Sequence, residues 1–270
     1  MDLVLKSLLF SSCLLFFGLS ACEKADNAKD LSGEADVIVK TTLGDVGIVL
    51  YDATPIHREN FLKLAKSGFY DSLYFHRIIL GFMVQIGDPG TRDGDFSQDN
   101  GPGYDLAAEF SEERIHTRAK LGAAREPDEQ NPEKRSAGSQ FYIVTGKTVS
   151  NALLDSVAQE RTKVLRGDMY DAYQLLPEAE RESLSFQAFL EREDFRPFDY
   201  TQEQRDVYLD QGGTPHLDFT YTVFGEVIYG MEIVRKIEVS QVDKYTHHPL
   251  KAVRILSMQV VADSSASAND

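Results

Sequence analysis

The stretch YFHRIILGFMVQIGDP at residues 74–89, followed by AGSQFYIVT at residues 137–145, is the most informative part of this 270-residue sequence. Successive side chains of a β-strand point to opposite faces, so the alternation places Arg77 on one face with every second residue. After a bend at Gly81 the same face continues to Gln85. The apolar side chains expected on this face are Phe75, Ile79 and Met83. The pattern predicts a small apolar pocket with a single fixed cation at its rim.

Both motifs, in this order, resemble the signature of the cyclophilin-type peptidyl-prolyl isomerases. A third block, LDFTYTVFGEV at residues 217–227, resembles the last active-site segment of that family. The resemblance covers residues 37–147 and continues from residue 216 to the final strand. It implies a mainly β fold, a closed eight-stranded antiparallel β-barrel capped by two helices, here with a helical insertion. The implied activity is cis–trans isomerisation of X–Pro peptide bonds.

Rotation about an X–Pro bond is slow because its barrier is about 18–20 kcal/mol. A donor aimed at the prolyl nitrogen favours the pyramidal nitrogen of the twisted state, so no metal, nucleophile or other cofactor is needed. Arginine suits this role because it stays charged and presents several N–H groups in a rigid fork. The resemblance makes Arg77 the donor and Gln85 the group that orients it and contacts the substrate backbone.

The resemblance also implies a substrate-binding surface. Its residues are Phe82, Met83, Ala124, Arg125, Gln140, Tyr142, Leu217 and Tyr221. The four expected around the proline ring are Phe82, Met83, Tyr142 and Leu217. Ala124 and Arg125 fall where the family pairs backbone groups with the peptide, and Gln140 falls where it uses a glutamine side chain.

Several positions depart from the family pattern. They are Leu80 for proline, Tyr142 for phenylalanine, Tyr221 for histidine, and His216 for the tryptophan associated with tight cyclosporin binding, which leaves inhibitor sensitivity open. Phe219, where the family often has glycine, and the extra hydroxyl of Tyr142 could reshape the groove. They motivate an alternative, a proline-peptide binding module or holdase without useful catalysis. A third interpretation is a purely structural lipoprotein, in which Arg77 is locked in a salt bridge and Met83, Tyr142 and Leu217 are fully buried under the insertion.

The N-terminus predicts export. Residues 3–21 are nearly all apolar or small and end in small residues, as in a secretory signal peptide, here residues 1–21. LSAC at residues 19–22 resembles the lipobox of bacterial lipoproteins, which predicts lipidation of Cys22. The alternatives are an ordinary thiol after an ordinary signal, or a retained anchor. We expect a chain held at the cell envelope by its acyl groups, periplasmic or facing the surface.

The charge of the chain limits its partners. It has 28 Lys and Arg against 43 Asp and Glu, a formal net charge of −15. Such a chain is repelled by phosphate backbones and anionic headgroups, so nucleic acid is not an expected partner and membrane contact should come from the acyl anchor alone. His247 and His248 lack a third ligand at metal spacing, so no metal site is expected. The expected partners are proline-containing, unfolded or partly folded polypeptides.

The remaining boundaries follow from composition and periodicity. Residues 22–36 are predicted to be a lipidated tether, residues 37–262 the cyclophilin-like domain, and residues 263–270 a disordered tail. A hairpin is expected over residues 37–52, a helix from Pro55 to a stop at Gly68, and a short helix over residues 231–237 before a last strand.

Residues 148–215 interrupt the resemblance and carry seven Lys and Arg against fourteen Asp and Glu. Apolar residues at helical spacing predict a first helix, Pro177 starts a second segment, and Thr201 with Gln204 predicts a capping box before a third. The segment is either a satellite helical bundle or a selector of substrates or partners. A negative surface would favour basic unfolded clients. Replacing it with a Gly/Ser linker should then spare tetrapeptide isomerisation but weaken action on a basic, proline-limited refolding protein.

Overall fold

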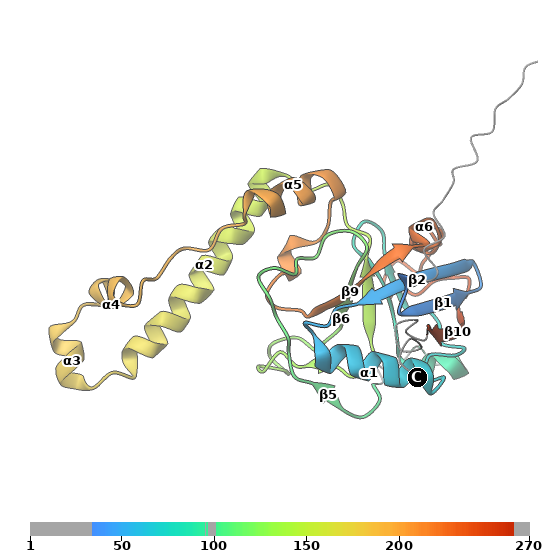
Figure 1. Cartoon of the computed structure of the whole chain (residues 1–270), viewed down its shortest axis with the longest axis horizontal. Coiled ribbons are helices and arrows are strands. Elements are labelled where there is room, and N and C mark those ends of the chain that lie inside the picture. The colour runs from blue at the N-terminus through green and yellow to red at the C-terminus, as the bar shows by residue number, and fades with distance from the viewer. Residues whose placement is uncertain (1–33, 95, 97–100, 262–270) are drawn as a thin grey trace, which may run out of the picture. The chain divides into compact units, whose positions relative to one another are not determined.

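The computed structural model describes residues 34–94, 96 and 101–261, all within one compact unit, Leu31–Asp270 (Figure 1). The predicted signal peptide, the Cys22 lipidation site, nearly all of the tether and the tail lie outside the described residues. In the described part of the chain, no helix combines the length and hydropathy that crossing a membrane would require.

Eight strands form one antiparallel sheet in the order β10-β1-β2-β9-β6-β8-β4-β3, as the predicted fold class requires. Their bounds are β1 Val37–Thr41, β2 Gly44–Leu50, β3 Arg77–Ile79, β4 Met83–Ile86, β6 Lys120–Ala123, β8 Phe141–Val144, β9 Val223–Tyr229 and β10 Ile255–Val260. The sheet curls until its two edges approach each other, with Phe75 N–H bonded to Val253 O and a bridge between Tyr74 and Arg254. A separate two-stranded ladder joins β5 (Asp105–Leu106) and β7 (Ser136–Ala137).

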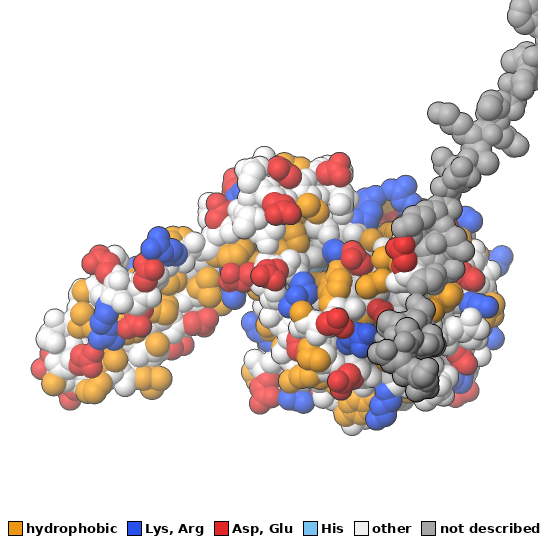
Figure 2. All heavy atoms as spheres, in the orientation of Figure 1, with side chains coloured by type: hydrophobic (Ala, Val, Ile, Leu, Met, Phe, Trp, Pro, Cys, Tyr) orange, Lys and Arg blue, Asp and Glu red, His pale blue; other side chains and the backbone are white. Residues whose placement is uncertain are grey.

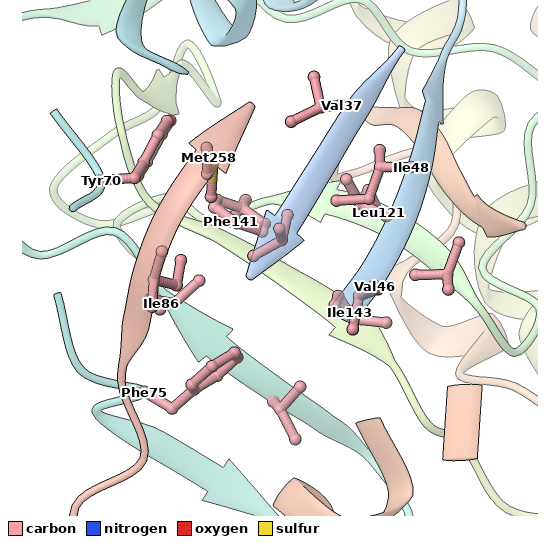
Figure 3. Packing of buried hydrophobic residues seen from close by; sticks show 14 of the residues in the cluster. Val37, Val46, Ile48, Tyr70, Phe75, Ile86, Leu121, Phe141, Ile143 and Met258 are labelled. Atoms are coloured by element: carbon pink, nitrogen blue, oxygen red, sulfur yellow. The ribbon is translucent and has the colours of Figure 1, made fainter. Parts of the chain in front are cut away.

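The interior of the curled sheet is a continuous apolar core, part of which Figure 3 shows. Its members come from most strands of the sheet and include Val37, Ile48, Leu121, Phe141 and Met258. Phe75 also packs here, so its predicted place on the Arg77 face is wrong. The reason is that β3 begins only at Arg77, and residues 75 and 76 are not strand, so simple alternation does not extend back to Phe75.

Two helices pack against the sheet. Helix α1 (Pro55–Lys66) begins at the predicted proline, but the side chain of Thr54 makes no capping hydrogen bond. The carboxylate of Glu109 takes that role, because it accepts the backbone N–H groups of Ile56 and His57 at 3.1 and 3.0 Å. Helix α6 (Met231–Glu238) confirms the short second helix and contacts β2, β3 and β4.

Four helices, one more than predicted, fill the segment between β8 and β9. They are α2 (Asn151–Gln174), α3 (Glu178–Ser183), α4 (Phe186–Arg192) and α5 (Gln202–Gln211). The capping box of Thr201 and Gln204 is confirmed at the start of α5. Helix α4 was missed, although Ser185 caps it by accepting the N–H of Ala188. Figure 1 shows α3 and α4 beside the C-terminal half of α2.

The inner part of this segment packs on the sheet domain. Leu154 and Ala158 of α2 join Tyr208 of α5 in a buried cluster that also contains Ile115 and Phe219. The two ends of the segment meet at Gly213, which bridges to Lys147 and to Thr117. A short 3₁₀-helix, η3 (Pro215–Leu217), then leads back toward β9. The segment is therefore anchored by its inner half, whereas α3 and α4 pack mainly on α2.

Candidate active site

Every predicted site residue within the described ranges lies on one of two adjoining cavities. The first has a volume of about 430 Å³ and opens beside Arg77. Its apolar and aromatic lining includes Phe82, Met83, Phe96, Ala124, Pro127, Tyr142, Leu217 and Tyr221. β4 supplies Met83, β8 supplies Tyr142 and η3 supplies Leu217, so the pocket is assembled from segments far apart in sequence.

Arg77 lies at the mouth of this cavity. Antiparallel pairing of β3 with β4 sets Arg77 opposite Gln85 and Ile79 opposite Met83, as the alternation predicted. The Arg77 guanidinium is exposed and donates from Nη1 to Oε1 of Gln85 at 3.3 Å. Gln85 is buried and donates in turn from Nε2 to Oε1 of Gln140 at 2.9 Å. Two glutamines thus hold the cation in place without neutralising it, and among the described residues no carboxylate lies within 4.0 Å of Arg77.

Ala124 does not offer its backbone to a peptide, contrary to the prediction. Its N–H donates to Gln140 O and its C=O accepts from Ala137 N–H, at 3.0 and 2.8 Å. These bonds tie the end of β6 to the segment around β7, so Ala124 contributes only its methyl group to the pocket. The backbone of the next residue, Arg125, makes no hydrogen bond to another residue in the described ranges. Arg125 therefore stays available for the pairing role.

The side chain of Arg125 fixes one wall of the pocket. It donates to Thr220 O at 2.8 Å, pairs with Asp128 at 2.7 Å and lies 4.5 Å from the centre of the Tyr221 ring. The hydrogen bond from Arg125 is the main cause that lowers the pKa of Asp128. Tyr221, which replaces the usual histidine, is thereby held between the Arg125 cation and Tyr142.

The second cavity, about 590 Å³, shares Gln85, Ala124 and Arg125 with the first and is lined in addition by Gln140. Its other walls are polar, with Asp105, Glu133 and Arg135 among them. A bound peptide could therefore pass from the apolar pocket into a polar neighbour across the Gln85 and Arg125 edge.

Tyr142 forms the floor of the apolar pocket. Its ring lies over Gly122, where a Cβ atom would come within 2.2 Å of Cζ of the tyrosine, so only glycine fits opposite it. The hydroxyl points to Nε2 of His116 at 3.0 Å, and burial raises the pKa of Tyr142 well above its usual value. The hydroxyl that distinguishes Tyr142 from phenylalanine is thus engaged inside the protein.

The binding-module interpretation supposed that Phe219 reshapes the groove, but Phe219 does not line the pocket. It is buried in the cluster beneath the helical segment, and its backbone has φ of 65°, in the left-handed region. Glycine adopts that conformation without strain, which accounts for the glycine often found there. His216 is stacked on Phe82 at 5.4 Å between ring centres, and burial lowers the pKa of His216.

Sequence reasoning missed two residues behind the pocket, His116 and Asp218. Both are buried, and Nδ1 of His116 lies 2.7 Å from Oδ1 of Asp218. No sequence spacing joins these positions, which are 102 residues apart. In the described residues, no group of three or more His, Cys, Asp or Glu side chains is arranged to hold a metal.

Comparison with known proteins identifies the class to which this fold and site belong. The sequence matches the family described as "Cyclophilin type peptidyl-prolyl cis-trans isomerase/CLD" over residues 36–181 and 199–260. A Staphylococcus aureus (strain USA300) relative, provisionally named a peptidyl-prolyl cis-trans isomerase, is 30% identical over 226 residues, covering 82% of this chain and 91% of the relative. This chain therefore belongs to the cyclophilin-type peptidyl-prolyl cis-trans isomerase family, whose members bind proline-containing peptides.

Two further matches differ in how much of the matching protein this chain covers. A Streptococcus pyogenes protein, provisionally named a bifunctional phosphatase/peptidyl-prolyl cis-trans isomerase, is 32% identical over 215 residues, but this chain spans only 36% of its length. A crystal structure of a cyclophilin-type peptidyl-prolyl cis-trans isomerase from Cryptosporidium parvum has a TM-score of 0.53 and 21% identity, covering 84% of this chain and 97% of that one. At that identity the likeness confirms the fold. A second structure of the same protein, with a TM-score of 0.52, was determined in the presence of the dipeptide Ala-Pro.

Proposed function

We propose that this chain isomerises X–Pro bonds in unfolded or partly folded secreted and envelope proteins, with Arg77 as the donor to the prolyl nitrogen. The observation that carries the proposal is the exposed, unneutralised guanidinium of Arg77 at the mouth of an apolar cavity. A purely structural protein would not need such an opening. It would be expected to pair Arg77 with a carboxylate and to bury Met83, Tyr142 and Leu217 under the helical segment. These three side chains are 1%, 4% and 8% exposed, but they line the cavity that opens beside Arg77.

The roles of the other residues follow from their positions. Gln85 and Gln140 orient Arg77, so the donor is fixed before the substrate arrives. The apolar walls hold the prolyl ring while the amide twists. The backbone of Arg125 pairs with the peptide, and Phe82 lies at the edge of the pocket against His216. No step requires covalent chemistry, because the barrier comes from amide resonance alone.

The alternative of a binding module was motivated by the Tyr142 hydroxyl and by Phe219, and the position of neither favours it. The Tyr142 hydroxyl is directed at His116, and Phe219 packs away from the pocket. Neither departure obstructs the groove. An isomerase therefore suits the pocket better than a holdase does.

Location at the envelope rests on the N-terminal sequence. The LSAC motif at residues 19–22 supports acylation of Cys22, and the polar residues that follow, 23–35, would serve as the tether. Thirteen extended residues reach at most about 45 Å, so an anchored domain would stay close to the membrane. Clients would then be proteins emerging at that surface.

Replacing Arg77 tests the proposal. We expect Arg77→Ala to lower cis-to-trans turnover of a proline tetrapeptide by about 100-fold, the usual effect of removing one fixed donor. Arg77→Lys should recover little, since an ammonium lacks the rigid fork. Stability should be unchanged because the side chain is exposed. Arg196→Ala, which removes an exposed arginine of the helical segment paired with Asp194, is the matched control.

Two results would overturn the proposal. Turnover by the native protein at the uncatalysed rate would exclude an isomerase, and an unaffected Arg77→Ala variant would exclude the assigned donor. NMR exchange spectra separate the binding-module alternative. Cross-peaks between cis and trans peptide at substoichiometric protein require catalysis, whereas titration shifts without them would indicate binding alone.

A further inference from the structure

A buried polar network connects the helical segment to the floor of the proline pocket. Tyr200, just before α5, and Tyr208, within it, donate to Oδ2 of Asp218 at 2.7 and 2.6 Å. Oδ1 of Asp218 accepts the backbone N–H of His116 and lies 2.7 Å from its Nδ1. Nε2 of His116 then meets the Tyr142 hydroxyl at 3.0 Å. All five side chains are at most 4% exposed.

The direction of each hydrogen bond is set by chemistry. An ionised carboxylate only accepts, so Nδ1 of His116 must carry a proton and donate to Asp218. In the tautomer that carries a single proton on Nδ1, Nε2 accepts from the hydroxyl of Tyr142. Asp218 receives four donors, which fill its accepting capacity and fix it in one position. A buried carboxylate with fewer donors would be costly, so Tyr200 and Tyr208 are integral to the network.

We propose that His116 and Asp218, fixed by Tyr200 and Tyr208, are positioning residues that hold the Tyr142 ring as the pocket floor. The helical segment thereby sets how well the pocket fits a prolyl ring. This inference rests on the proposed function, since it assigns Tyr142 to the wall that the substrate proline touches. The proposal also accounts for the tyrosine at residue 142, because phenylalanine has no hydroxyl to form a hydrogen bond with Nε2 of His116.

The network should act on substrate affinity and not on the chemical step. Arg77, Gln85 and Gln140 form a chain of hydrogen bonds with one another, and in the described part of the protein none of these bonds reaches His116 or Asp218. A displaced floor weakens contact with the ground state and the twisted state alike. Loss of such uniform binding raises KM and leaves kcat nearly unchanged.

Substitutions at His116 separate its two contacts. Asparagine places a polar group near the Nδ1 position and can still reach Asp218, whereas glutamine extends to the Nε2 position and can still reach Tyr142. We expect His116→Asn to raise KM for a proline tetrapeptide by about tenfold, the effect of losing one buried hydrogen bond. His116→Gln should raise KM less. Neither should change kcat more than about twofold.

A double-mutant cycle shows whether His116 acts through Tyr142. Tyr142→Phe removes the hydroxyl, so adding His116→Asn to it should raise KM no further. If His116 only stabilises the fold, the two effects will instead add, and the proposal is wrong. Urea unfolding of each variant at the same pH keeps stability and affinity apart.

Substitutions in the helical segment test its part. We expect Tyr208→Phe and Tyr200→Phe each to raise KM about threefold and to shift the ring resonances of Tyr142 in tyrosine-labelled protein. Tyr173→Phe is the matched control, because its hydroxyl donates to Leu184 O at 2.7 Å within the segment and lies outside the network. KM and Tyr142 resonances that are unchanged in both Tyr208→Phe and Tyr200→Phe would refute the proposal, even if the His116 variants fail to fold.

The same variants remain informative if the native protein proves not to be an isomerase. In that case peptide turnover is absent throughout. The dissociation constant for the proline tetrapeptide and the Tyr142 resonances would still report whether the Tyr142 ring is held in place. A Tyr208→Phe variant that weakens peptide binding in a catalytically inactive protein would support the network while refuting the proposed activity.

Discussion

Removal of the outer half of the helical segment should leave the active site intact. The structure provides a natural junction, because Oγ1 of Thr162 accepts the N–H of Phe198 at 3.0 Å. Replacing residues 163–197 with a short Gly/Ser linker would therefore join two backbone positions that already lie together. The change removes α3, α4 and the second half of α2, but keeps Leu154, Tyr200 and Tyr208.

The expected cost in stability follows from what each half buries. Phe189 and Leu190 of α4 are buried, and the aromatic partners of Phe189, Tyr173 and Phe186, leave with them. We expect the free energy of unfolding to change by less than about 1 kcal/mol. Removing all of residues 148–215 would also uncover Phe219 and delete both tyrosine donors. At about 1.5–3 kcal/mol for each large side chain and each charged hydrogen bond, that loss approaches the whole stability of a domain.

The assay compares two substrates. Tetrapeptide isomerisation by the shortened protein should stay within about threefold of the native rate, because no residue of the outer half lines the pocket. Refolding of a basic, proline-limited protein should slow by about threefold to tenfold at low salt, and this difference should shrink at high salt. The outer half carries five Lys and Arg against eight Asp and Glu, and Figure 2 shows acidic side chains spread along it.

A charge variant of the full chain separates charge from shape. Asp171→Asn, Glu178→Gln and Glu182→Gln together neutralise three exposed acids that form no ion pair with another described residue. If steering by charge is correct, this variant should lose part of the advantage with the basic client and none with the tetrapeptide. Equal loss of activity on both substrates in the shortened protein would show that the outer half supports the sheet domain. Equal retention on both would show that it takes no part in catalysis.

Two other predictions concern anchoring and pH. Cys22→Ser should yield an uncleaved or soluble product that takes up no labelled palmitate, and native protein that fractionates like the variant would refute the lipobox. Burial lowers the pKa of His57, despite the opposing hydrogen bond and charge of Glu109. Among the described residues its Nε2 has no hydrogen-bond partner. The unfolded state therefore binds the proton first, so this contribution to stability is complete above about pH 6.5 and is lost as pH falls toward the lower folded pKa. His57→Asn should reduce the pH dependence of urea unfolding between about pH 7.5 and 5.5, and an unchanged dependence would contradict the assignment.

Local patterns predicted individual elements of the fold, whereas the eight-stranded antiparallel sheet was expected from the family resemblance. Alternation around a turn gave the β1–β2 hairpin, and proline at the first helical position gave α1, because these signals depend on neighbouring residues only. Glu109 as the cap of α1 could not be predicted, since it is brought to the helix from 53 residues away. Phe75 was misplaced because the position at which a strand begins depends on its pairing with a distant partner.

The site residues likewise separate into those that local patterns predicted and those whose role depends on tertiary contacts. Arg77 and Gln85 were placed on one face by strand alternation, and the pairing of β3 with β4 agrees. The engaged backbone of Ala124 and the outward turn of Phe219 depend on tertiary contacts with Gln140 and with the helical segment. His116 and Asp218 gave no signal, because a single buried histidine and a single aspartate are common in any sequence of this length.

The departures from the family pattern make physical sense as a set. A tyrosine at residue 142 brings a hydroxyl into a buried floor, where an unpaired polar group is costly, and His116 with Asp218 provides its partner. Phe219 has a left-handed backbone, and apolar packing of its side chain offsets that strain. The centre of its ring lies 4.7 Å from the centre of the Phe198 ring in the helical segment. Tyr200 contributes to both solutions, through its hydroxyl on Asp218 and its ring near Phe219. Reverting Tyr142 to phenylalanine would leave Nε2 of His116 without its partner, and reverting Phe219 to glycine would remove the ring on which Phe198 packs. The inner half of the helical segment and the pocket floor are therefore best understood as one structural unit.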